Sequence, residues 1–320
     1  MGRYVIRRIL QAIPLLFLLS IFMFTLIHLM PGGPDQVIFN PHLSPASRAA
    51  LRARFGLDDP VAVQYLKWLR NVLTGDFGFS FGTNLPVTYI LGQRFPATLE
   101  LFGCALTLAL VVAIFLGVIS AIRQGTITDY ILTTLSYFGI AMPIFLFGLI
   151  AQYIFGVLLH WFPTSGTATL GYQLDPFDAF VDHIQHLILP MMVLSITFIA
   201  GWSRYMRSSM IEVIKQDYMR TARAKGVSPG SLMLRHALRN AIIPLITIVA
   251  LDFGAVAGGA TITEGVFAWP GMGLLFIQSL EIRDYPVLLA MLMIGAIFVI
   301  SFNLIADILY AVMDPRIRYS

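Results

Sequence analysis

The sequence contains little charge and almost no cysteine. Only 12% of its 320 residues are Asp, Glu, Lys or Arg, whereas 58% are hydrophobic. Soluble domains are about 25% charged and about 45–50% apolar, so a single large soluble domain is excluded. Cys104 is the one cysteine, which rules out an intramolecular disulfide and is typical of a small buried side chain. Most of the chain is therefore predicted to lie in a lipid bilayer.

Motifs for nucleotide and metal binding are also missing. The sequence has no G-x-x-x-x-G-K-[ST], and none of its three lysines follows a glycine. Its histidines lack the spacing of a ligand set or a catalytic triad, and we interpret His183 and His186 as interfacial polar residues. We expect the net charge of +4 to arise from Lys and Arg in cytoplasmic segments, and not to indicate a nucleic-acid partner. We expect no catalytic residue, cofactor or metal in this chain.

Six apolar runs are long enough to cross about 30 Å of hydrocarbon, which takes about 20 helical residues. The fourth is predicted to end early, at Trp202-Ser203-Arg204, and Pro143 is expected to kink the third or to place part of it at the interface. The first is too long for a signal-peptide core of about 7–15 residues and is expected to be retained. The fold class is an all-α membrane protein with six transmembrane helices. The predicted spans are Ile9–Met30, Ala97–Ile122, Ile131–Leu159, Leu187–Met206, Ala241–Thr263 and Pro286–Met313.

The distribution of Lys and Arg predicts that both termini are cytoplasmic. With the N-terminus inside, 14 of the 21 basic residues lie in inner segments, and the short outer segments carry only Arg283. The other six lie in a first outer loop, and loops of that length cross a membrane largely regardless of charge. The predicted regions are 1–30 (cytoplasmic N-terminus and first span), 31–96 (outer loop or cap), 97–313 (a five-helix core) and 314–320 (a cytoplasmic tail).

The outer loop is predicted to contain two short helices and one extended stretch. Ser44-Pro45 and Gly56 are start and stop signals for the first helix, and the second runs from Asp59-Pro60 to Gly75. Residues 76–84 alternate Phe with small residues, which favours an extended chain. Such a loop either caps the span ends or forms a docking surface. Leu274–Leu280 is too short to span and is predicted to be an interfacial or re-entrant half helix.

Five polar residues fall inside the predicted spans, and carboxylates in a membrane are costly and typical of a pathway or relay. Asp252 is the strongest of these, because it lies in mid-span before a glycine-rich seam in which Gly254 and Gly258 form a G-x-x-x-G pair. A helix-packing seam and a substrate contact both remain open as explanations. The pathway candidates are Asp252, Gly254, Gly258, Gly259 and Glu100, and the other intramembrane polar residues are Gln152, Asn303 and Asp307.

The most informative segment is polar and basic, from Asp217 to Pro244, between two apolar runs. Helix formers from Asp217 to Lys225 are followed by Gly226 as a stop, and Ser228-Pro229 starts a second helix that leads into the fifth span. The result is a helix–turn–helix elbow at the inner membrane face. Binding to lipid headgroups and docking of a soluble partner are the two alternatives, whereas a DNA-reading role is disfavoured by the flanking spans.

Residues Asp217–Gly226 and Arg235–Ala241, with Pro244, resemble the cytoplasmic coupling loop of permease subunits from bacterial binding-protein-dependent ABC importers. The resemblance extends over the whole chain. Within this group the sequence is most similar to the dipeptide, oligopeptide and nickel branch, and there to the first of the two permeases. Arg7-Arg8, Gly56–Pro60 and Phe267–Gly273 also carry it. The Glu-Ala-Ala start of the superfamily motif is here Arg220-Thr221-Ala222, a departure that peptide-type permeases share.

The resemblance implies a type I ABC importer permease fold in the bacterial plasma membrane, with a coupling loop at 211–240. It implies as partners a second homologous permease, two ATPase subunits that bind ATP and Mg, an extracytoplasmic substrate-binding protein on the outer loop, and membrane lipid. Peptides are the favoured substrates, and nickel chelates or oligosaccharides are the alternatives. The alternatives from other classes are an ion-coupled secondary transporter, with Asp252 or Glu100 as relay, and a membrane-embedded hydrolase. The implied ATPase-coupling residues are Asp217, Tyr218, Arg220, Thr221, Ala222, Arg223, Ala224, Lys225, Gly226, Arg235 and His236.

Overall fold

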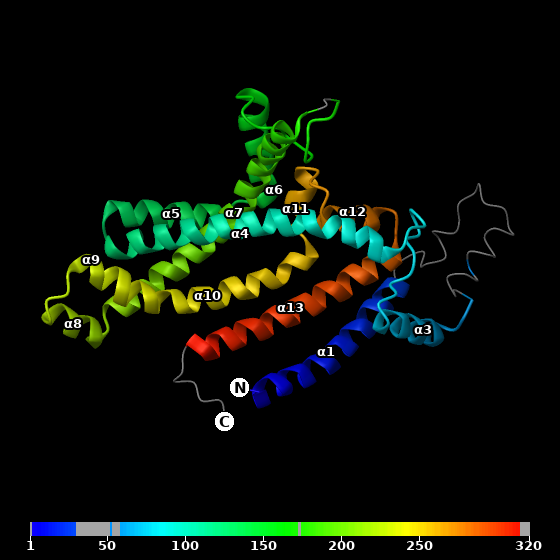
Figure 1. Ribbon diagram of the computed structural model, residues 1–320, viewed down its shortest axis with the longest axis horizontal. Coiled ribbons are helices and arrows are strands. Elements are labelled where there is room, and N and C mark those ends of the chain that lie inside the picture. Colours follow the sequence, from blue (N-terminus) through cyan, green and yellow to red (C-terminus); the bar gives the residue numbers. More distant parts are fainter. Residues whose placement is uncertain (1, 30–51, 53–57, 172–173, 314–320) are drawn as a thin grey trace. The chain divides into compact units, whose positions relative to one another are not determined.

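The computed structural model describes residues 2–29, 52, 58–171 and 174–313. These residues are mostly helical (Figure 1), and an isolated bridge between Phe79 and Pro86 is the only strand-like pairing within them. Five helices are long and apolar enough to cross a membrane, or six if one sharply bent pair counts as a single span. This confirms the all-α class predicted from the apolar runs.

The helices differ widely in length along the chain. The long ones are α1 (Gly2–Leu29), α4 (Val87–Ile122), α7 (Pro176–Ile214) and α13 (Tyr285–Met313). The bent pair consists of α5 (Ile127–Ala141) and α6 (Ile144–Ala151), the latter extended by a π-helix, η2 (Gln152–Leu158). The remaining elements are α3 (Val61–Leu73), α8 (Asp217–Ala224), α9 (Pro229–Ser231), η3 (Leu232–Leu238), α10 (Arg239–Phe253), η4 (Gly254–Gly258), α11 (Thr261–Val266) and α12 (Met272–Glu281).

The chain divides into two compact units. The first comprises Met1–Thr98, Ala255–Thr261 and Pro270–Ile300. Its core contains one apolar cluster in which Phe24 of α1 meets Leu288 of α13, and a second in which Leu91 of α4 meets Leu275 of α12. These clusters explain why the short helix α12 is stable, since its apolar side is covered by protein.

A carboxylate at the start of α13 organises a loop in the same unit. Asp284 is buried and accepts hydrogen bonds from the Ser80 hydroxyl and from the backbone N–H groups of Phe81 and Gly82, the latter two at 3.0 and 3.2 Å. Residues 81–83 therefore form a turn. The prediction of an extended chain over residues 76–84 was wrong for this part, because Asp284 satisfies the backbone donors that a strand would need to pair.

The second unit comprises Leu99–Gly254, Ile262–Trp269 and Ser301–Ser320. In it Ala151 of α6 packs with Leu189 and Val193 of α7 and with Phe267. The amide of Gln152 donates to the carbonyl oxygens of Thr164 and Val266, at 2.7 and 2.9 Å. This polar residue inside a predicted span thus ties the end of α6 to the irregular segment at Thr164 and to the end of α11.

Three predicted span boundaries needed correction. Helix α4 begins at Val87 and contains Pro96, although its span was predicted to start at Ala97. Helix α7 continues through Trp202-Ser203-Arg204 to Ile214, beyond the predicted end of the fourth apolar run. The fifth span is one helical stretch over Pro229–Gly258 and ends before the predicted Thr263. In α7 the polar side chains have partners on neighbouring helices, which removes the reason for the helix to end.

Other predicted elements are confirmed. The third span breaks at Met142-Pro143, where α5 and the α6–η2 helix differ in direction by 102°. Helix α3 ends just before Gly75, whose φ is +81°, and α12 is the short apolar helix that was expected near Leu274–Leu280. The helix predicted over 44–56 lies outside the described residues apart from Arg52, which is helical.

Candidate coupling elbow and polar sites

The elbow has the local structure that its sequence predicts. Helix α8 ends before Gly226, whose φ of +80° is a conformation that side chains with a Cβ disfavour. The Gly226 N–H donates to the Arg223 carbonyl and the Val227 N–H to the Ala222 carbonyl, at 3.0 and 3.3 Å, which closes the helix end. Ser228 has the extended backbone of an N-cap and Pro229 is the first residue of the next helix, but the Ser228 side chain makes no capping hydrogen bond.

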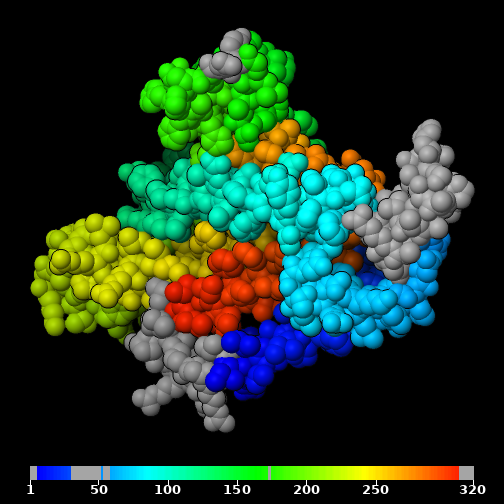
Figure 2. All heavy atoms as spheres, turned by 45° about the vertical axis from the view of Figure 1, so that its right-hand side comes forward, coloured from blue at the N-terminus to red at the C-terminus, as the bar shows by residue number. Residues whose placement is uncertain are grey.

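The elbow buries its apolar side chains and exposes its charges. Met219, Leu232 and Ala237 are at most 2% exposed, so they anchor the elbow to the rest of the second unit. By contrast, the side chains of Asp217 and Arg220 are 98% and 79% exposed, and they lie 3.7 Å apart. The elbow forms the yellow to olive surface at the left edge of Figure 2. The other exposed coupling candidates are Tyr218, Thr221, Arg223, Ala224, Lys225, Gly226 and Arg235, while Ala222 and His236 are partly buried.

A groove lies beneath the turn of the elbow. Its volume is about 510 Å³, and it joins the end of α4 to the segment that connects α8 with η3. Its lining is mostly apolar, with Arg223 at one edge. The elbow therefore rests beside the end of α4 rather than standing apart from it. The lining residues are Ala121, Ile122, Gln124, Ile214, Arg223, Val227, Pro229, Leu232 and Met233.

An ion pair that sequence reasoning missed holds the start of α5 onto α7. Arg207 donates from Nε and Nη2 to the two carboxylate oxygens of Asp129, at 2.7 and 2.8 Å, and the Asp129 side chain is only 4% exposed. The same carboxylate accepts from the Ser120 and Thr133 hydroxyls and from the Gly125 N–H. No local pattern in the sequence indicates this pair, because Arg207 lies 78 residues after Asp129.

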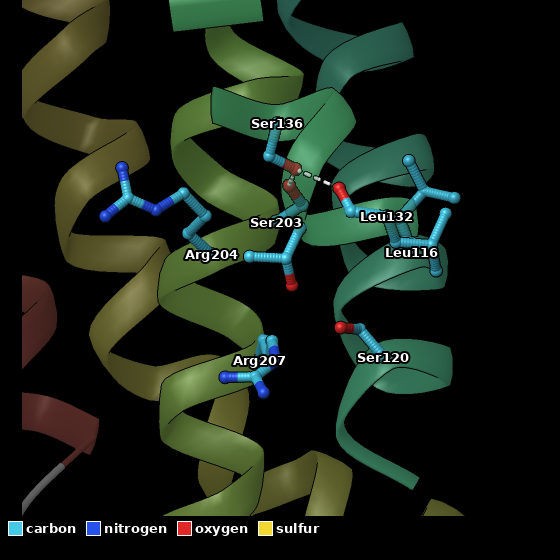
Figure 3. A pocket seen from close by; sticks show the side chains of 8 residues that line it. Leu116, Ser120, Leu132, Ser136, Ser203, Arg204 and Arg207 are labelled. Atoms are coloured by element: carbon cyan, nitrogen blue, oxygen red, sulfur yellow. Dashed lines mark hydrogen bonds between the residues drawn. The ribbon is translucent and has the colours of Figure 1, made fainter. Parts of the chain in front are cut away.

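A small polar pocket adjoins this ion pair (Figure 3). Ser136 of α5 and Ser203 of α7 lie 3.1 Å apart between the helices, which explains how α7 accommodates a serine there. Arg204 and Arg207 lie about one turn apart on α7, and Arg204 extends away from the helix that carries Ser120. The second unit thus gathers both arginines at the end of α7 that leads into the elbow.

The two intramembrane carboxylates singled out from the sequence each have a partner. Asp252 accepts a hydrogen bond from Trp202 Nε1 at 2.7 Å, and Glu100 lies 2.7 Å from His183 Nε2. His183 Nδ1 also lies 3.0 Å from the Thr167 carbonyl, whereas His186 contacts the Asp182 carbonyl at 2.8 Å. In the described part of the chain no group of three or more His, Cys, Asp or Glu could hold a metal ion.

The glycine seam is tight at a different place from the predicted pair. A Cβ on Gly258 would meet nothing within 4 Å, so within the described chain this residue does not mediate a close helix approach. A Cβ on Gly259 would lie 2.2 Å from the backbone nitrogen of Gly273, and the φ of Gly259 is +75°. Gly254 is buried at the start of η4. The backbone of this bend therefore touches the backbone at the start of α12, and Gly259 is the glycine it requires.

Similarity to known proteins covers nearly the whole chain. Residues 113–319 match the family described as binding-protein-dependent transport system inner membrane component, and residues 1–102 match the N-terminal region described for such membrane components. The oligopeptide transport system permease protein AppB of Bacillus subtilis is 46% identical over 322 residues, with 100% of both chains covered. The dipeptide permease protein DppB of Alkalihalophilus pseudofirmus is 38% identical with 99% covered, and the glutathione permease protein GsiC of Escherichia coli K12 is 38% identical with 100% covered.

Proposed function

Because this chain belongs to the family of inner membrane components of binding-protein-dependent transport systems, we propose that it conducts peptides across the membrane and receives ATP-driven motion through its elbow. As a permease subunit of an ABC transporter it is a multi-pass protein of the bacterial inner membrane. In this function α5 and α6 would form one bent span, which gives six spans with both termini in the cytoplasm.

The peptide substrate is proposed from the relatives. The three described above are named for oligopeptide, dipeptide and glutathione transport. Their similarity extends through both family regions, so the likeness is not limited to the elbow. A peptide substrate is therefore better supported than a nickel chelate or an oligosaccharide.

The single observation that carries the coupling role is the division of the elbow into an anchored side and a charged side. Met219 and Leu232 are buried in the second unit, so a force applied to the elbow is passed to α7 and α10. The exposed Asp217 and Arg220 contribute little to the stability of the fold, since an ion pair in solvent adds only about 0–1 kcal/mol. These charges suit contact with an ATPase subunit. The ATP and Mg would be bound by that subunit, since this sequence has no Walker A motif of its own.

The partners follow from the same family role. A second, homologous permease would complete the pathway, and two ATPase subunits would bind at the elbow face. An extracytoplasmic binding protein would deliver peptide to the outer side. Within this arrangement Asp252, Gly254, Gly258, Gly259 and Glu100 remain the pathway candidates, although Asp252 and Glu100 are each engaged by a neighbour in this structure.

The test is a substitution at Gly226 in the reconstituted transporter. A Cβ at this position meets nothing within 4 Å, so Gly226→Leu strains the backbone by about 1–2 kcal/mol without a clash. We expect normal membrane insertion and continued ATP hydrolysis, with peptide uptake per ATP reduced severalfold. Uptake of a radiolabelled tripeptide into proteoliposomes and release of phosphate measure the two activities.

Gly230→Leu is the matched control. Gly230 also belongs to the elbow and also has open space at its Cβ, but it lacks a positive φ. Unchanged uptake per ATP in Gly226→Leu would contradict the coupling role of this turn. Uptake driven by an ion gradient without ATPase subunits would instead favour a secondary transporter.

A further inference from the structure

A groove between α5 and α7 has a charged end and an apolar end. Its volume is about 550 Å³. The two helices run in opposite directions, since Asp129 near the start of α5 bonds Arg207, whereas Gly139 near its end lies against Ala200. One stripe of each helix faces the groove: Thr133, Tyr137 and Ile140 from α5, and Gly201, Arg204 and Ser208 from α7.

Arg204 supplies the cation of this groove. Arg207 also reaches it, but its charge is matched by the bidentate hydrogen bonds to Asp129. The described residues give Arg204 no carboxylate partner. Its guanidinium carbon lies 4.3 Å from the centre of the Tyr137 ring, and Nη2 lies 3.4 Å from the Tyr137 hydroxyl. Stacking on the ring holds the planar group in place while most of its five N–H donors remain for a ligand.

The other end of the groove is open and apolar. A Cβ on Gly201 would meet nothing within 4 Å, and Ile140 on the facing helix is 47% exposed. Tyr137 and Tyr205 flank the middle of the groove and are 55% and 57% exposed. Tyrosines of this kind gather where hydrocarbon meets headgroups, because the ring is apolar and the hydroxyl is polar.

We propose that the α5–α7 groove binds an anionic phospholipid, with its phosphate at Arg204 and one acyl chain along Ile140 and Gly201. An arginine fork matches the oxygens of a phosphate and is attracted to an anionic leaflet. The acyl chain has no polar group to satisfy beside Ile140, whereas a peptide there would leave amides unpaired. A free phosphate would occupy the charged end and leave the apolar end empty.

The test counts the phosphatidylglycerol that the purified transporter retains in nanodiscs of phosphatidylcholine with a minor share of phosphatidylglycerol, using native mass spectrometry. Arg204→Gln should lower retention about fivefold, which corresponds to the attraction of one arginine near an anionic surface. Gly201→Leu should lower it as well, because the new side chain fills the acyl end while Arg204 is untouched. Arg239→Gln, which removes an exposed arginine at the start of α10, should leave retention unchanged.

Three outcomes would overturn the proposal. A loss with Arg204→Gln but not with Gly201→Leu would indicate a free anion site, and glycerol phosphate would then bind equally well. An equal loss with Arg239→Gln would indicate general attraction to the surface. Displacement of phosphatidylglycerol by a soluble tripeptide would assign the groove to substrate. Arg204→Lys, which keeps the charge without the planar fork, should retain intermediate amounts and thereby separates lost binding from misfolding.

Discussion

The ion pair at Asp129 and the pair in the elbow use the same chemistry for opposite purposes. The Asp129 side chain is 4% exposed and accepts from Arg207, two hydroxyls and a backbone N–H. Asp217 is 98% exposed and lies 3.7 Å from Arg220. The first carboxylate cannot lose its arginine without leaving a largely buried charge unpaired, so we assign it to the fold. The second can change partners at little cost, which suits the contact with an ATPase subunit that we propose for the elbow.

The largest effect is expected from breaking the buried pair. Arg207→Met should lower the stability of the purified transporter by about 3 kcal/mol or more, because it leaves the Asp129 carboxylate without its charge partner. Thermal unfolding followed by circular dichroism in detergent measures the change. Arg204→Met is the matched control, since Arg204 lies about one turn away on α7 without a carboxylate partner in the described chain. Equal destabilisation by both variants would show that the hydrogen bonds to Asp129 add nothing to stability.

A smaller effect is expected at Asp252, which has a single side-chain donor. Trp202→Phe keeps the apolar contacts of the ring but removes the Nε1–H that donates to Asp252. We expect a loss of about 1–2 kcal/mol, because a half-buried carboxylate loses its hydrogen bond from Trp202. The double variant Trp202→Phe with Asp252→Leu should be less destabilised than the sum of the single changes. Additive losses would show that the hydrogen bond contributes nothing.

The smallest effect on stability is expected in the elbow. Asp217→Ala and Arg220→Ala should leave the midpoint of thermal unfolding unchanged, because both side chains lie in solvent. The same variants should weaken binding of the ATPase subunit to the permease, measured by co-purification at increasing salt. A drop in thermal stability without a change in co-purification would reverse the roles assigned to the two pairs.

Features of the fold that depend on neighbours in sequence were predictable. The apolar runs indicate where the long apolar helices lie, Pro143 marks the break between α5 and α6, and Gly226 with Pro229 marks the elbow. Each signal lies within a few residues of its effect, because helix length, proline geometry and a positive φ are local properties. The elbow could therefore be outlined from the sequence, including the positions where its helices end and begin.

Features that depend on distant partners were not predictable. The continuation of α7 past Trp202 and Ser203 was not predicted, because their partners, Asp252 and Ser136, lie 50 and 67 residues away. The Asp129–Arg207 pair spans 78 residues and has no local pattern. The tight glycine was assigned to a G-x-x-x-G pair, whereas the contact depends on the backbone of Gly273 opposite Gly259. In each case the outcome depends on which segment packs against the residue in question. That neighbour cannot be identified from a single sequence.

The Asp284 carboxylate has a consequence for how the protein is made. Its hydrogen bond to Ser80 joins residues 204 positions apart, and the turn at Phe81 and Gly82 has its backbone donors satisfied by the same group. A ribosome that has synthesised the chain up to α10 has not yet produced Asp284. The turn after α3 can therefore gain these hydrogen bonds only after Asp284 has been synthesised, and truncated chains that stop before Asp284 should be cut more readily by proteases within residues 80–83.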